Sequence, residues 1–295
     1  MVAVFAVFGR SWELAKASLS VLRSDKELLI FPLISFLGLV LVSIVFLIPW
    51  VLVGGLNQFE TGQPSILSYV VLFIFYLVTY TVTFYFQTAL VGAAMIRLDG
   101  GDPTLRDGLR MATSRLPSII GYALIAATVG MILRWISERA GLIGSIIIGI
   151  IGFAWNIATF LVVPVLVTEN VGPVEAIKRS GGLLRRTWGE QLIGVGGIGI
   201  VFGLLFFVVA LLGAGLTFVL FSITPILGLV GLIALVIALG IIGLVGSAAS
   251  GVYTASLYRY ATKGEAGASF RTETMAAAFR SRSGNPAVSP GPPSY

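Results

Sequence analysis

Residues 191–258 carry no Asp, Glu, Lys or Arg, and this long uncharged stretch constrains the fold more than any other feature. As one helix it would be about 100 Å long, while the hydrocarbon core of a bilayer is about 30 Å thick. The stretch must therefore fold back on itself. We place the turn at Thr224 and Pro225, because proline lacks a backbone N–H and keeps the preceding residue out of a helix.

Four further uncharged and mostly apolar stretches cover residues 28–59, 61–96, 116–133 and 140–168. About 20 apolar residues are enough to cross a bilayer as a helix. With 57% hydrophobic residues, the chain has too little polar material to cover a soluble core. The period-2 alternation of a membrane β-barrel is missing. The sequence therefore predicts an all-α membrane protein with six transmembrane helices, near 28–54, 66–96, 117–134, 142–168, 192–222 and 226–258.

The charges between these helices are distributed unequally. Of the 19 Lys and Arg residues, all but Arg134 and Arg139 fall before the first helix or after the second, fourth and sixth. Loops rich in Lys and Arg stay in the cytoplasm. The pattern therefore predicts that both termini are cytoplasmic.

The segment VGPVEAIKRSGGLLRRTWGEQL places an amphipathic helix near residues 173–189, with Pro173 in its first turn. One apolar stripe recurs at spacings of three and four: Val174, Ile177, Gly181, Leu184 and Trp188. The cations point largely elsewhere, and such a helix can lie among lipid head groups. The candidate contacts to anionic head groups are therefore Lys178, Arg179, Arg185 and Arg186.

Two other segments repeat this pattern. A helix near 103–116 would have Asp102 as N-cap, Pro103 as its first residue, and a stripe of Leu105, Leu109, Ala112 and Leu116. An N-terminal helix over residues 1–27 would bury Phe5, Phe8, Trp12, Ala15, Leu19 and Leu22.

The chain is thus predicted as a pseudo-threefold repeat, in which each amphipathic cytoplasmic helix precedes two helices of the membrane domain, residues 28–262. Residues 263–282 form a weaker amphipathic segment. Residues 283–295 form a tail rich in Pro, Ser and Gly that has nothing to bury and is expected to be disordered.

Two stretches carry a resemblance: WELAKASLSVLRSDKELLIFPLIS and PVLVTENVGPVEAIKRSGGLLRRTWGEQLIG. Together they resemble an uncharacterised family of prokaryotic six-helix membrane proteins. The second stretch is also similar to the membrane domain found beside some glycerophosphodiester phosphodiesterases. The resemblance implies a multi-pass protein of a prokaryotic cell membrane. It implies no activity and no catalytic residues, and the soluble phosphodiesterase domain is missing from this chain.

The residue types themselves limit the chemistry. The chain has no cysteine and no histidine, which excludes disulfides, thiolate chemistry, histidine-ligated haem and ordinary zinc sites. No ionisable residue falls inside the six predicted helices, although such residues are the usual mark of function there. We therefore expect no catalytic residue, no cofactor and no metal, and the chain is not expected to be an enzyme.

Polar side chains do occur in two predicted membrane helices, and Thr83, Gln87 and Asn156 are the candidates for a functional site there. They would either line a cavity or form hydrogen bonds between helices, and the second reading is favoured because such contacts are common wherever membrane helices pack.

Small residues also recur four apart in the last two helices: Gly199 and Gly203, then Gly243, Ser247 and Gly251. Small residues at this interval let helix backbones approach closely. The spacing favours close packing between the fifth and sixth helices over an oligomer interface.

Three functions fit these features. The first is a non-catalytic scaffold or accessory subunit that binds membrane lipids, through anionic head groups, or a partner membrane protein. The second is a transporter or lipid-handling permease, which a midplane cavity reaching Gln87 would favour. The third, an enzyme acting on lipid head groups, lacks a convincing cluster of acids. Nucleic acid is not expected as a partner, because no aromatic residues for base stacking are interleaved with the cations.

Overall fold

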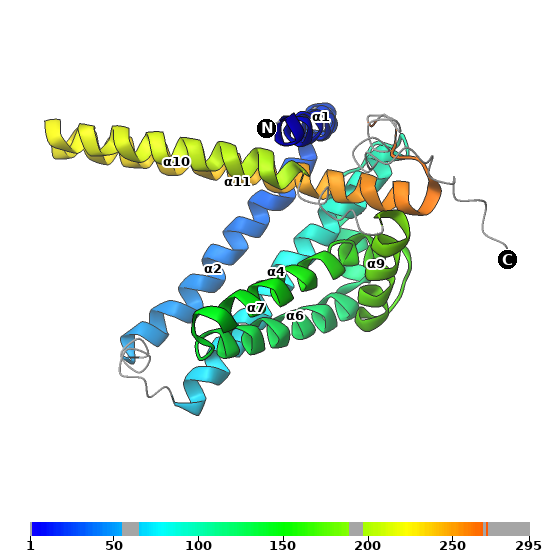
Figure 1. Ribbon diagram of the computed structural model, residues 1–295, viewed down its shortest axis with the longest axis horizontal. Coiled ribbons are helices and arrows are strands. Elements are labelled where there is room, and N and C mark those ends of the chain that lie inside the picture. The colour runs from blue at the N-terminus through cyan, green and yellow to red at the C-terminus, as the bar shows by residue number, and fades with distance from the viewer. Residues whose placement is uncertain (1, 55–64, 189–196, 268–269, 271–295) are drawn as a thin grey trace. The chain divides into compact units, whose positions relative to one another are not determined.

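The computed structural model describes residues 2–54, 65–188, 197–267 and 270, and every regular element in these residues is a helix (Figure 1). In chain order they are α1 (Val2–Ser24), the 3₁₀ helix η1 (Lys26–Leu29), α2 (Ile30–Leu52), α4 (Ile66–Leu98), α5 (Leu105–Ser114), α6 (Leu116–Ser137), α7 (Gly141–Ala158), α8 (Val162–Thr168), α9 (Pro173–Trp188), α10 (Gly197–Ile223) and α11 (Pro225–Lys263).

Six stretches of the described chain are helical, long and apolar enough to cross a membrane, as the sequence predicts. They are Lys26–Leu52, Ile66–Leu98, Leu116–Ser137, Gly144–Thr168, Ile198–Ile223 and Pro225–Lys263. The fourth stretch differs from its prediction, because it is broken into α7 and α8 around Thr159–Leu161. Pro164 explains the break, since its ring would clash with the carbonyl four residues earlier, that of Phe160.

The chain divides into two compact units. One comprises residues 1–29, 94–102 and 188–295, and the other comprises residues 30–93 and 103–187. We call them the hairpin unit and the central unit and describe each by itself.

In the central unit, α5 lies very close to two other helices. A Cβ atom on Gly108 would come within 2.5 Å of Phe31 Cζ on α2 and 2.7 Å of the Ala89 carbonyl oxygen on α4. α8 is the most buried helix described in this unit, with each residue from Val162 to Val167 buried. The residues PVLV, which carry part of the family resemblance, are therefore core, while Thr168 after them is exposed.

The prediction for the start of α5 is wrong by two residues. Its N-cap is Thr104 rather than Asp102, and Pro103 precedes the helix. The Thr104 hydroxyl accepts a hydrogen bond from the Asp107 N–H, and the Asp107 carboxylate accepts one from the Thr104 N–H. This reciprocal pair satisfies two backbone donors at once. Asp102 instead forms an ion pair with Arg97.

α9 begins at Pro173 as predicted, but among the described side chains its buried face shares only Leu184 with the predicted stripe. The buried residues described are Ala176, Ser180, Leu183 and Leu184, while Val174 is 56% exposed. The Ser180 hydroxyl accepts a hydrogen bond from the Leu161 N–H, 3.0 Å away, at the α7–α8 break. That backbone donor has no partner within α8, so its need for an acceptor fixes which face of α9 turns inward.

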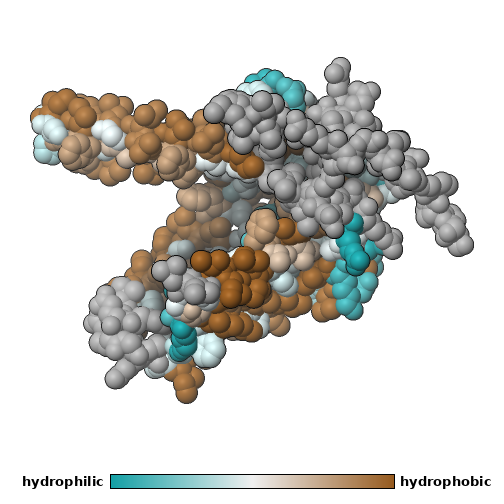
Figure 2. Space-filling model, in the orientation of Figure 1, coloured by the Kyte–Doolittle hydropathy of each residue, from teal (hydrophilic) through white to brown (hydrophobic). Residues whose placement is uncertain are grey.

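In the hairpin unit, α10 and α11 pack along each other as an antiparallel pair (Figure 1). Thr224 is the N-cap of α11, accepting a hydrogen bond from the Leu227 N–H, and Pro225 is its first residue. The predicted turn is confirmed. Apolar residues cover most of the visible length of the pair (Figure 2), as a membrane environment requires.

The glycines at which α10 and α11 approach each other are not the ones predicted. A Cβ atom would meet Leu235 at Gly213, Phe202 at Gly246 and Leu220 at Gly231. At Gly199, Gly203 and Gly243 it would enter open space. Large side chains of one helix thus fill the gaps left by glycines of the other, which spacing within a single helix does not reveal.

α1 packs against both α10 and α11. Its buried face consists of Ser11, Leu14, Ala15, Ser18, Val21 and Leu22. Among the members of the predicted stripe whose side chains are described, only Ala15 and Leu22 belong to this face, and Trp12 is 45% exposed. The small side chains of Ser11, Ala15 and Ser18 bring α1 closer to the pair than a face containing Trp12 would. The side chains of Phe5 and Phe8 lie outside the described part of the structure, as do most of segment 263–282 and the whole of tail 283–295.

Candidate functional site

The three polar residues predicted within the membrane helices have separate environments in the central unit. Thr83 on α4 donates its hydroxyl hydrogen bond to the Thr79 carbonyl of the same helix, at 2.8 Å. Gln87, one turn further along α4, is exposed, and so is Asn156 on α7. The structure therefore does not gather these three side chains around one site.

Other hydroxyls in the membrane helices are used in the same way as that of Thr83. Thr81 donates to the Leu77 carbonyl at 2.7 Å, and Thr159 donates to the Trp155 carbonyl at 2.8 Å. A threonine bonded to the carbonyl one turn earlier satisfies its own hydroxyl without needing another helix. These polar side chains are thus compatible with an apolar environment.

An aromatic column on α4 is a feature that the sequence analysis missed. The rings of Tyr76, Tyr80 and Phe84 stack along one face, with centroids 6.2 Å and 5.6 Å apart. The column continues to Tyr122 on α6, whose ring centroid lies 4.5 Å from that of Phe84. At its other end, the Arg134 guanidinium donates a hydrogen bond to the Tyr76 hydroxyl at 2.9 Å. The spacing of four residues in YLVTYTVTF was the signal that could have revealed it.

The basic residues predicted to contact head groups are also in different situations. Arg179 donates to both carboxylate oxygens of Glu169, at 3.2 and 3.0 Å. Lys178 and Arg185 are exposed, and the side chain of Arg186 lies outside the described residues. A recess of about 200 Å³ runs along α9, lined by Glu175, Lys178, Arg179, Gly182 and Leu183.

The segment between α8 and α9 is held to the start of α6. Arg115 donates a hydrogen bond to the side-chain oxygen of Asn170, whose backbone is left-handed with a φ of 50°. Ser118 donates to the Val171 carbonyl at 3.3 Å. Asn170 tolerates this conformation better than most residues, so the connection before α9 is a fixed turn.

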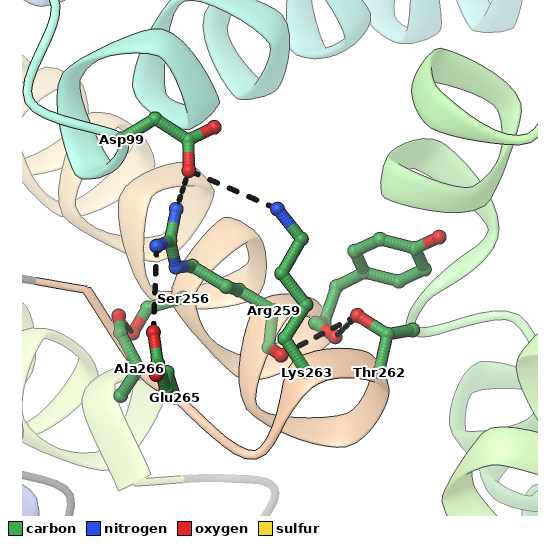
Figure 3. A network of polar contacts seen from close by, with 8 residues as sticks. Asp99, Ser256, Arg259, Thr262, Lys263, Glu265 and Ala266 are labelled. Carbon is green, nitrogen blue, oxygen red and sulfur yellow. Dashed lines mark hydrogen bonds and ion pairs between the residues drawn. The ribbon is translucent and has the colours of Figure 1, made fainter. Parts of the chain in front are cut away.

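A network of charged residues lies in the hairpin unit, at the end of α11 (Figure 3). Arg259 forms an ion pair with Asp99, which follows α4, and the Lys263 ammonium lies 3.8 Å from the same carboxylate. Glu265 lies 3.9 Å from the Arg259 guanidinium. The Arg259 side chain is only 13% exposed, so these acids neutralise a mostly buried cation.

The chain after α11 turns back beside this network. Gly264 ends the helix in the left-handed conformation, with a φ of 74°. The Ser256 hydroxyl then donates a 2.6 Å hydrogen bond to the Ala266 carbonyl, and both residues are buried. Figure 3 draws Ser256 and Ala266 together with the charged network. The end of the sixth apolar helix is therefore a folded structure held by polar contacts.

Asp25 is a buried acid between α1 and η1 in the same unit, with 6% of its surface exposed. Its Oδ1 accepts a hydrogen bond from the Glu27 N–H at 3.2 Å, while its Oδ2 has no partner among the described residues. Burial raises the pKa of the Asp25 carboxyl, against the opposing effects of that hydrogen bond and of the Arg97 charge. No three acidic side chains in the described ranges gather closely enough to form a metal site.

Comparison with protein families gives a match over most of the described membrane helices. The model of a family of unknown function, DUF6159, matches residues 66–270, which is more than half of the chain and runs from the start of α4 to the segment after α11. No curated protein and no solved structure matches the chain.

Proposed function

The chain belongs to the DUF6159 family of unknown function, and we propose that it is a non-catalytic scaffold or accessory subunit of a membrane. In this proposal the six apolar helices anchor the chain, while the charged helices beside them bind anionic lipid head groups or a partner membrane protein. The observation that carries it is the way polar groups are used: the hydroxyls of Thr81, Thr83 and Thr159 bond to carbonyls of their own helices.

The position of the ionisable groups supports the same proposal. The strongest described cluster, around Asp99 and Arg259, lies at the end of α11 and binds parts of the chain to one another. α11 has 39 residues and would be about 58 Å long, so its last turns extend beyond a hydrocarbon core of about 30 Å. Ionic contacts at the end of α11 can hold the fold together without lining a transport path through the membrane.

The exposed cations are the proposed contacts of this scaffold. Lys178 and Arg185 on α9 are exposed, as are Arg106 and Arg110 on α5. Each Lys or Arg close to an anionic surface contributes about 1 kcal/mol of attraction. Arg179 contributes less in this proposal, because Glu169 already neutralises it.

The setting of the protein is part of the proposal. The Lys and Arg distribution supports cytoplasmic termini, with α1, α5 and α9 on the cytoplasmic side as the leading helices of a pseudo-threefold repeat. The resemblance to prokaryotic six-helix proteins supports a prokaryotic cell membrane. The similarity to the membrane domain beside glycerophosphodiester phosphodiesterases stays a prediction.

A test of this function is native mass spectrometry of the full chain purified in lipid nanodiscs. The proposal expects a protein subunit in fixed ratio, or anionic phospholipid, that is lost in Arg185→Ala and kept in Arg139→Ala. Arg139 is the matched control, because it is an exposed cation on the side predicted to face outward. A chain that retains neither, with or without the substitution, contradicts the proposal.

The alternative function is a transporter or lipid-handling permease. The observation in its favour is that Gln87 and Asn156 expose amide groups on apolar helices, where polar surface is costly. In the same spectra, a small solute that is lost in Gln87→Leu and kept in Arg185→Ala would favour this alternative.

A further inference from the structure

The orientation of α1 is fixed by its packing, and this determines which of its residues face outward. One face is buried against α10 and α11: Ser11, Leu14, Ala15, Ser18, Val21 and Leu22. At about 100° per residue these six positions occupy a single half of the helix surface. α1 therefore presents a defined opposite half to its surroundings.

One edge of this outward half combines aromatic, cationic and apolar side chains. Trp12, Lys16 and Arg23 fall within about 40° of one another around the helix, and Leu19 lies beside them. Trp12 is 45% exposed, Lys16 and Arg23 are exposed, and Leu19 is half-buried. The Lys16 ammonium lies 5.8 Å from the centroid of the Trp12 ring. We call these four residues the α1 outer edge.

The other edge of the outward half is different. It carries Glu13, Ser20 and Ser24, all exposed and without an apolar side chain among them. Glu13 also forms an ion pair with Lys16 at 2.8 Å, which partly neutralises the Lys16 charge on the side of the polar edge. The outward half is thus divided lengthwise into an aromatic and cationic edge and a small polar edge.

We propose that the α1 outer edge binds anionic phospholipid head groups of the membrane in which the chain lies. Tryptophan and cations together are the side chains favoured at the boundary between head groups and hydrocarbon. The first apolar helix begins at Lys26, two residues after α1 ends, and Lys26 is itself exposed. The end of α1 is therefore tethered at that boundary, with its cations beside a negative surface.

This surface is distinct from the exposed cations of α9, and it lies outside the part of the chain that the family model matches. The inference rests on the proposed function only in taking the chain to lie in a membrane. A protein partner is the competing occupant. Lipid is favoured because the three cations Lys16, Arg23 and Lys26 follow one another toward the start of the first membrane helix.

The chain has no cysteine, so single cysteines can carry a spin label at chosen positions of the full protein. The test compares Leu19→Cys, on the outer edge, with Ser20→Cys, on the polar edge. The labelled chains are placed in nanodiscs of phosphatidylcholine alone or mixed equally with phosphatidylglycerol. Collisions with oxygen, which concentrates in lipid, and with a nickel chelate, which stays in water, then report the surroundings of each label.

The expected result is that the label at position 19 collides with nickel several-fold less than the label at position 20 when phosphatidylglycerol is present. This difference should shrink in phosphatidylcholine alone and in the double variant Lys16→Gln and Arg23→Gln. Arg139→Gln is the matched control, because Arg139 stacks on another exposed tryptophan, Trp135, at 4.3 Å. That control should leave the label at position 19 unchanged.

Three outcomes would overturn the proposal. Equal nickel collisions at positions 19 and 20 would mean that no lipid covers the edge. Protection of position 19 from both oxygen and nickel would mean that protein covers it. A protection that is the same without phosphatidylglycerol would remove the preference for anionic lipid. A label at Leu211 on α10, which is 62% exposed, shows separately whether the chain lies in the membrane.

Discussion

Arg259, four residues before the end of α11, is paired with Asp99, which lies 160 residues earlier in the chain, just after α4. The Arg259 side chain is 13% exposed and the Asp99 side chain is 51% exposed. The pair therefore connects the ends of two apolar helices through a cation that has largely left water. Without Asp99, the only acid described near the Arg259 guanidinium is Glu265, at 3.9 Å.

We predict that Asp99→Asn destabilises the protein by about 1–2 kcal/mol, because it removes the closest counter-charge of a mostly buried arginine. The measurement is the midpoint of thermal unfolding in mild detergent. Asp102→Asn is the matched control, since Asp102 is 96% exposed in its pair with Arg97. Equal midpoints for the two variants would show that the Asp99 pair does not stabilise the fold.

Gly108→Ala is predicted to destabilise the central unit by about 1–3 kcal/mol through overpacking. The added Cβ would lie 2.7 Å from the Ala89 carbonyl oxygen, which is backbone and cannot rotate away. Gly181→Ala on α9 is the control, because its Cβ would meet open space. Replacing glycine by alanine there should stabilise the helix by about 0.5–1 kcal/mol. If both substitutions stabilise in chemical unfolding, the close approach of α5 to α4 is wrong.

Acid should weaken α5 through Asp107. Hydrogen bonds from the Thr104 hydroxyl and N–H hold the pKa of the Asp107 carboxyl below its usual value. A carboxyl with a lowered pKa stabilises the folded state fully above its unfolded pKa of about 3.9. That stabilisation is lost as the pH falls through the folded value. Asp107→Asn should lower the unfolding midpoint at neutral pH and make no difference in strong acid; a deficit that persists in strong acid would point to another cause.

Asp25 should show the opposite dependence on pH. Burial raises the pKa of the Asp25 carboxyl, so the folded pKa lies above the unfolded value of about 3.9. As the pH rises through the interval from the unfolded pKa to the folded pKa, the carboxyl ionises more readily in the unfolded chain, and the folded state loses stability. Asp25→Asn is therefore predicted to raise the unfolding midpoint at neutral pH and to leave it unchanged below that interval. A lower midpoint at neutral pH would show that Arg97 or another group compensates the charge.

The six apolar helices could be predicted because a membrane helix depends on a local property, the length of an uncharged stretch. The turn before α11 was predictable for the same reason, since Thr224 and Pro225 act on their immediate neighbours. The break before α8 also had a local signal in Pro164. In these cases the chain within one turn determines the outcome.

The buried faces of α1 and α9 could not be predicted, because their partners determine them. Ser180 turns inward to accept a hydrogen bond from the Leu161 N–H, which becomes available only where α8 begins. Trp12 turns outward because α10 and α11 receive the face with smaller side chains. A stripe of apolar residues indicates that a helix is amphipathic. Where two adjacent stripes have similar polarity, the helices packed against them determine which stripe is buried.

The candidate polar residues show a similar limit. The sequence identifies Thr83, Gln87 and Asn156 as polar. The hydrogen bond from the Thr83 hydroxyl to the Thr79 carbonyl depends on the side-chain rotamer of Thr83, which the sequence does not specify. The pairing of Arg179 with Glu169 was easier to predict from the sequence, because the two residues lie ten residues apart across the turn before α9. The pairing of Asp99 with Arg259 depends on the whole course of the chain between them.

The most direct test of this account is the sidedness of single cysteines, which this cysteine-free chain allows. Ser114 is the last residue of α5, two residues before α6 begins at Leu116, and Ser137 is the last residue of α6. Cysteines at positions 114 and 137 therefore flank one apolar helix. In intact cells, an impermeant maleimide is predicted to label position 137 and to reach position 114 only after the membrane is opened. Labelling of both positions from outside, or of position 114 alone, would contradict the proposed arrangement in the membrane.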